Sequence, residues 1–110
     1  MSHSALLIID VQRSFEQKDF WQDDHFPDFK RAISRLIDGC QSRNVPLIDI
    51  FHVSQGVFAL ESGLVTPMSF LSHEPQVRIY KHVHNALTES GLDLWLRERN
   101  INHLIISGMR

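Results

Sequence analysis

The chain has 110 residues, of which 43% are hydrophobic, and it carries 11 Lys and Arg against 13 Asp and Glu. This balance excludes a disordered or low-complexity segment. The net charge of −2 also gives no basic surface of the kind that follows a nucleic-acid backbone. No apolar run approaches the roughly 18 residues that cross a membrane, and the first residues lack the features of a signal peptide. We therefore expect a cytoplasmic protein that binds neither nucleic acid nor membrane and forms one domain over residues 1–110.

The first half of the chain predicts a strand, a helix and a second strand. Residues 5–9 form an unbroken apolar run, which is typical of a strand buried on both faces. The polar and aromatic residues of 11–26 predict a loop. Apolar residues then recur at steps of three and four, which predicts an amphipathic helix over 28–43 with Asn44 as its C-terminal cap. A second strand is predicted over 45–53.

The second half repeats this alternation after a long connection. Residues 54–75 have no regular period, and such long connections are usually functional or face a partner. A third strand is predicted over 77–81. A helix follows, with Thr88 or Ser90 as its N-cap and Asn100 at its end.

A fourth apolar strand over 103–108 completes the order strand, helix, strand, loop, strand, helix, strand. Strands that alternate with helices at these spacings predict an α/β fold. We expect a doubly wound, mostly parallel sheet with right-handed crossovers and helices on both faces.

Three polar residues stand at the carboxyl ends of predicted strands, where open α/β sheets bind their ligands. Asp10 ends the first strand, His52 the second and Lys81 the third. A carboxylate beside an ammonium can act as a base and an electrostatic partner, which makes these residues a candidate site. Polar residues also end strands simply because the chain turns there, and this alternative stays open.

Aromatic residues and one cysteine have structural as well as functional interpretations. Phe15, Trp21 and Phe26 follow the first strand, where they would line an apolar pocket or cover the sheet as plain core. Cys40 lies on the apolar stripe of the predicted helix at 28–43. Buried cysteines usually behave as small inert hydrophobes, so we do not expect Cys40 to be a nucleophile.

Four segments in chain order resemble the isochorismatase-like cysteine hydrolases. Residues 5–15 end in Asp-Val-Gln-Arg-Ser-Phe, which is similar to the D-[MV]-Q-x-x-F signature that opens this family. Residues 58–63 resemble a loop in one branch of small cysteine hydrolases. Residues 80–96 are similar to a block that begins K-x-x-x-(N/S)-A-F, and residues 102–108 resemble the strand that precedes the catalytic cysteine.

The resemblance implies a six-stranded parallel sheet, of which four strands are present, and a hydrolase with an Asp-Lys-Cys triad. Asp10 would be the general base and Lys81 the cation, with a cysteine attacking a small amide or related acyl substrate. We expect Phe15, His52 and Asn85 to contact that substrate. The resemblance also implies a homo-oligomer, a dimer or tetramer, and no organic cofactor.

Seven histidines raise the question of a metal site. His82 and His84 form an H-x-H pair, but zinc sites normally need three or four suitably spaced ligands. In the nicotinamidase branch of the family a carboxylate lies two residues before the histidine that ends the second strand, whereas Ile50 stands there here. We therefore expect no metal.

In the family the nucleophilic cysteine follows the glycine that ends the fourth strand, here Gly108, and the sequence given ends at Arg110. An apolar fourth strand at the end of a chain would leave a flat hydrophobic edge, which proteins avoid. We therefore expect the N-terminal portion of a domain of about 180–200 residues, inactive alone. Three alternatives stay open: a vinyl-ether hydrolase of the isochorismatase type without a cysteine, a non-enzymatic flavodoxin-like binding module, and a family member that has lost catalysis.

Overall fold

A computed structural model of the chain describes residues 3–14, 26–82 and 91–108. Its four strands form one sheet in the order β3-β2-β1-β4, and each neighbouring pair is parallel. The strands are β1 (Ser4–Ile9), β2 (Leu47–His52), β3 (Val77–Lys81) and β4 (His103–Gly108). The predicted parallel α/β fold is confirmed.

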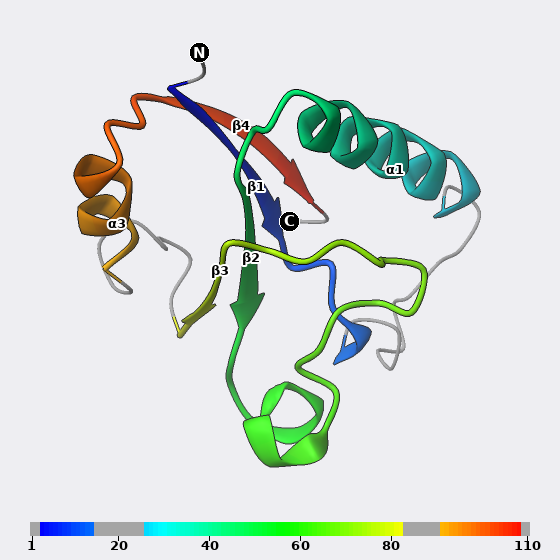
Figure 1. The fold of residues 1–110 in the computed structure, drawn as a ribbon. Coiled ribbons are helices and arrows are strands. Elements are labelled where there is room, and N and C mark those ends of the chain that lie inside the picture. Colours follow the sequence, from blue (N-terminus) through cyan, green and yellow to red (C-terminus); the bar gives the residue numbers. More distant parts are fainter. Residues whose placement is uncertain (1–2, 15–25, 83–90, 109–110) are drawn as a thin grey trace.

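Helices α1 (Phe26–Ser42) and α3 (Leu92–Glu98) cover opposite faces of the sheet (Figure 1). Alternate residues of β1 face the two helical layers, which explains why its apolar run is unbroken. On the α1 side the buried core includes Leu6, Ile8, Leu47, Ile33, Ile37 and Cys40. On the α3 side it includes Ala5, Leu7, Ile48, Ile50, Leu92 and Leu96.

The chain reverses its direction across the sheet at β1. It builds β2 and β3 on one side of β1 and then returns through α3 to place β4 on the other side. In open α/β sheets, ligands bind at the carboxyl ends of the strands where the order reverses. The topology therefore directs attention to the ends of β1 and β4.

Helix α1 and strand β2 meet in a tight turn. Helix α1 ends at Ser42, and Asn44 adopts the left-handed conformation expected of its cap, with a φ of 59°. The N–H of Val45 donates to the carbonyl of Cys40 at 2.8 Å, so Val45 still belongs to the turn that ends the helix. Strand β2 consequently begins at Leu47, two residues later than predicted.

The start of α3 differs from the prediction. The residue before Leu92 is Gly91, with a φ of 78° and no side-chain cap, so neither Thr88 nor Ser90 holds this position. Those two residues lie outside the described ranges. At the other end Asn100 has a φ of 56°, and the N–H of Ile101 returns to the carbonyl of Leu96 at 2.9 Å, which closes the helix as expected.

The connection between β2 and β3 runs along the α1 side of the fold. It contains two short 3-10 turns, η2 (Gly56–Phe58) and η3 (Leu60–Ser62), and then pairs with the segment after β1. The N–H of Ser14 donates to the carbonyl of Leu64 at 2.9 Å. The connection is thereby held next to the carboxyl end of β1.

Strand β4 is the edge strand on the β1 side of the described sheet. Ile105 packs against the core on the α1 side, and Leu104 packs against the core on the α3 side. The side chain of Ile106, by contrast, is exposed to solvent, and this residue is 67% exposed. Ile106 is therefore an exposed apolar residue on the edge strand of the described sheet. No helix in those ranges is long and apolar enough to cross a membrane.

Candidate active site

Asp10 and Lys81 form an ion pair at the carboxyl ends of the strands. The Nζ of Lys81 lies 3.1 Å from the Oδ1 of Asp10, and both side chains are less than 5% exposed. Asp10 follows β1 with a φ of 63°, so the chain turns sharply at this residue. Because β2 lies between β1 and β3, the lysine reaches across the end of β2 to meet the carboxylate.

A buried pair of this kind is costly to form and still more costly to break, because a single remaining charge would have no counter-ion. Its position at the switch-point end of the sheet is where a reacting group would be placed. The carboxylate can accept a proton, and the ammonium supplies positive charge beside it. The structure thus brings together two of the residues that the sequence selects.

His52, the third candidate, is the register partner of Lys81 at the end of β2. It is partly buried, and its ring meets the ring of Phe58 edge-on, with centroids 5.6 Å apart. The two other predicted contacts, Phe15 and Asn85, lie outside the described residues, as does Trp21. Their expected roles stay predictions.

Gln12 is a site residue to which the sequence pattern assigned no role. It is fully buried, and its side-chain amide forms hydrogen bonds with both the N–H and the carbonyl of His52. The Oε1 accepts from the His52 N–H at 2.8 Å, and the Nε2 donates to the His52 carbonyl at 3.0 Å. Gln12 is part of the Asp-Val-Gln motif in the sequence, but its contacts could be identified only from the structure.

A second buried charge cluster lies inside β2 rather than at its end. The Nε2–H of His73 donates to the Oδ1 of Asp49 at 2.6 Å, and both side chains are 1% exposed. The Nη2 of Arg78 reaches the other carboxylate oxygen at 3.3 Å. The sequence signal for this cluster is the presence of Asp49 within an apolar strand, because a buried aspartate nearly always has a partner.

Cys40 packs in the α1 core at 6% exposure. Burial raises the pKa of the Cys40 thiol, and the nearby Arg43 charge only partly opposes this. A thiol that is kept protonated is a poor nucleophile. This environment matches the expectation that Cys40 is a core residue.

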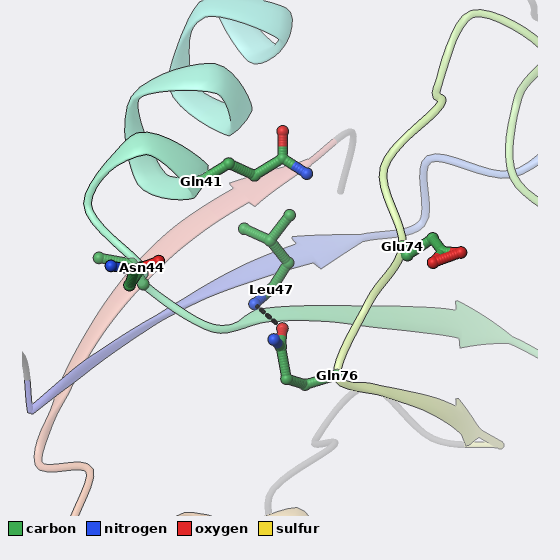
Figure 2. Close-up of a pocket in the computed structure, with 6 residues that line it drawn as sticks. Gln41, Asn44, Leu47, Glu74 and Gln76 are labelled. Atoms are coloured by element: carbon green, nitrogen blue, oxygen red, sulfur yellow. Dashed lines mark hydrogen bonds between the residues drawn. The ribbon is translucent and has the colours of Figure 1, made fainter.

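A polar pocket opens at the opposite end of the sheet, between the end of α1 and the start of β3 (Figure 2). In it the N–H of Leu47 donates to the side-chain carbonyl of Gln76 at 2.9 Å. This pocket lies at the amino end of β2 and does not include the Asp10–Lys81 pair. Within the described ranges, no three His, Cys, Asp or Glu residues are grouped so that they could hold a metal ion.

The family model described as "Isochorismatase domain" matches residues 4–110. The fold is similar to that of an isochorismatase family protein, with a TM-score of 0.87 and 23% identity, over 100% of this chain and 66% of that one. It is also similar to a cysteine hydrolase from Pseudomonas syringae pv. phaseolicola 1448A, with a TM-score of 0.85 and 19% identity, over 98% and 60%. An N-carbamoylsarcosine amidase from Thermoplasma acidophilum matches with a TM-score of 0.80 and 13% identity, over 98% and 68%.

The chain spans 66%, 54% and 58% of the lengths of the first three solved structures that it matches. No curated protein matches it significantly. The structural likenesses show the fold, while the family model covers nearly the whole chain. The chain belongs to the isochorismatase family.

Proposed function

We propose that the protein hydrolyses a small amide or related acyl compound, with Asp10 and Lys81 as two members of an Asp-Lys-Cys triad. The buried ion pair of 3.1 Å at the switch-point end of the sheet is the observation that carries this proposal. The cysteine is expected after β4 in the whole protein, as the family resemblance implies. A homo-oligomer, a dimer or tetramer, is part of the same proposal.

In this mechanism Asp10 accepts the proton of the thiol, and the thiolate attacks the acyl carbon. The tetrahedral intermediate collapses as Asp10 returns the proton to the leaving amine, which leaves a thioester on the cysteine. Asp10 then takes a proton from water, whose oxygen attacks the thioester. The acid product leaves, and the proton returns to the thiolate. Lys81 holds the carboxylate in place and favours the thiolate through its charge.

The test uses the protein expressed from its complete reading frame. Ammonia release is measured on a panel of primary carboxamides and N-carbamoyl amino acids, a choice guided by the amidase neighbour. We expect Asp10→Asn and Lys81→Met each to lower kcat/KM by about a thousandfold, as for loss of a general base or its partner. Asp93→Asn, which removes one side of the exposed Asp93–Arg97 pair on α3, should leave kcat/KM unchanged.

Iodoacetamide separates the chemical alternatives. Loss of hydrolysis on alkylation supports the cysteine mechanism. The Cys40→Ala variant is the control: it should be active before treatment and should lose activity on alkylation as the parent protein does, because the cysteine that reacts is not Cys40. Hydrolysis that depends on Asp10 but resists alkylation would instead indicate the vinyl-ether type of chemistry without a cysteine. Activity that survives both Asp10→Asn and Lys81→Met would refute this site assignment.

A further inference from the structure

The Asp10–Lys81 pair joins two elements that are not neighbours in the sheet, so its separation depends on how each is tied to β2. On one side the N–H of Val53 donates to the carbonyl of Lys81 at 2.8 Å. On the other side the N–H of Asp10 donates to the carbonyl of Ile50 at 2.8 Å. Among the residues that the structure describes, these are the last backbone hydrogen bonds between β2 and β3 and between β1 and β2 on the side of the ion pair.

The backbone ladder between β1 and β2 cannot continue past Asp10. In a regular parallel ladder the N–H of His52 would next donate to the carbonyl of Asp10, and the carbonyl of His52 would accept from the N–H of Gln12. The left-handed conformation of Asp10 turns the chain away before that point. The side-chain amide of Gln12 occupies the place instead, accepting from the N–H of His52 and donating to its carbonyl.

We propose that Gln12 is a positioning residue whose carboxamide serves as the last rung of the β1–β2 ladder. It closes a ring of contacts that runs from Asp10 through Gln12, His52, Val53 and Lys81 back to Asp10. The ring holds the turn at Asp10 at the separation from β3 at which the ion pair forms. This inference rests on the proposed function for its catalytic meaning, but its geometry is testable alone.

The chemistry of the side chain supports this role over direct contact with a substrate. A carboxamide has both a donor and an acceptor, as a peptide group does, and it carries no charge. Gln12 is fully buried, and its Nε2 also donates to the Ser14 hydroxyl at 3.2 Å. The amide is therefore committed to protein groups and is out of reach of a ligand.

Lysine acetylation provides a direct readout, because the chain has three lysines and only one of them belongs to the ring. The protein from the complete reading frame is treated with N-hydroxysuccinimide acetate, and the modification of each lysine is followed by mass spectrometry. Lys81 is buried and should react slowly. Lys30, exposed on α1, serves as the internal reference.

Gln12→Met keeps the size of the side chain and removes its hydrogen bonds. We expect the acetylation rate of Lys81, relative to Lys30, to rise by about tenfold, because local opening at the site becomes easier. On the best substrate of the amide panel, kcat should fall by about tenfold or more while KM stays within about twofold. Gln12→Asn, which keeps the amide on a shorter stem, should give a smaller change and serves if Gln12→Met does not fold.

Ser14→Ala is the matched control. It removes a buried bond to Gln12 and the bond from Ser14 Oγ to the Leu64 carbonyl, but it leaves the contacts with His52. Its Lys81 rate and kcat should stay within about twofold of the parent protein. An unchanged Lys81 rate in both Gln12 variants, or an equal rise in Ser14→Ala, would overturn the proposal. A rise confined to the Gln12 variants, with hydrolysis indifferent to Asp10→Asn, would retain the positioning role and reject the proposed function.

Discussion

Gly108 at the end of β4 lies against the backbone of Ile9 at the end of β1. The two residues are register partners, and a Cβ on Gly108 would come within 2.0 Å of the carbonyl oxygen of Ile9. The φ of Gly108 is 138°, a backbone angle that residues other than glycine rarely adopt. Only glycine allows β4 to end this close to the residue before Asp10, and so the chain that leaves β4 starts beside the candidate site.

Gly108→Ala should therefore destabilise the protein. The methyl group would force the ends of β1 and β4 apart, at a cost of about 1–3 kcal/mol in the free energy of unfolding. Gly39→Ala is the matched control, because Gly39 lies within α1 and a Cβ there meets nothing within 4 Å. That change should stabilise the protein by about 0.5–1 kcal/mol. Urea unfolding measures both, and equal effects would contradict the close approach at Gly108.

The buried Asp49–His73 pair should matter more to stability than the Asp49–Arg78 pair. His73 ties the long connection to the middle of β2 through a 2.6 Å bond in a site closed to water. His73→Ala removes this partner from a buried carboxylate, which should cost about 2–4 kcal/mol.

Arg78→Ala is the comparison, since the Arg78 side chain is 36% exposed and its nearest contact with Asp49 is 3.3 Å long. Water can replace much of what is lost, so a cost of about 1 kcal/mol or less is expected. Denaturant unfolding of the two variants in parallel gives the ranking. A larger loss for Arg78→Ala would mean that the arginine, and not the histidine, is what stabilises the buried carboxylate.

The strands and the ion pair could be predicted because local patterns encode them. The unbroken apolar run of β1 indicates burial on both faces, and the parallel order then places Asp10 and Lys81 at the same edge of the sheet. The boundaries shifted where backbone geometry intervened, as at Val45, which completes the helix turn instead of starting β2. Periodicity carries no information about such single hydrogen bonds.

The role of Gln12 and the Asp49–His73 pair could not be predicted, for two different reasons. Gln12 fills a gap in the ladder that exists only because Asp10 is left-handed, a conformation that non-glycine residues seldom adopt. His73 meets Asp49 only because of the path that the connection takes, since the two residues are 24 positions apart in the sequence. The pattern of hydrophobic residues predicts neither the backbone conformation of a single residue such as Asp10 nor the path of a long loop.

Asp10 and Lys81 should be strongly coupled in stability. Asp10→Asn or Lys81→Met alone leaves a buried charge without its partner, so each should cost about 3–5 kcal/mol. The double variant Asp10→Asn with Lys81→Met buries neither charge and should cost less than the sum of the two. A double-mutant cycle by denaturant unfolding should give a coupling of about 2 kcal/mol or more. Additive losses would mean that the two side chains do not interact in the folded protein.

Cys40 should make the protein less stable at alkaline pH. Burial raises the pKa of this thiol above its ordinary value of 9.0, and the opposing charge of Arg43 is the smaller influence. Well below pH 9 the thiol is protonated in both the folded and the unfolded chain, so its ionisation does not affect stability there. As the pH rises further, the unfolded chain ionises first, and the free energy of unfolding falls until the folded thiol also ionises.

Cys40→Ala isolates this effect, because every other group that titrates above pH 8 is present in both proteins. The variant should lose about 1 kcal/mol at pH 7 from the small cavity that it leaves in the α1 core. Between pH 8 and pH 10.5 the parent protein should lose more stability than the variant, so that the difference between them narrows. Urea unfolding at a series of pH values measures this difference. A gap that is constant across the series, or that widens toward high pH, would show that the folded protein does not hold Cys40 in its protonated form.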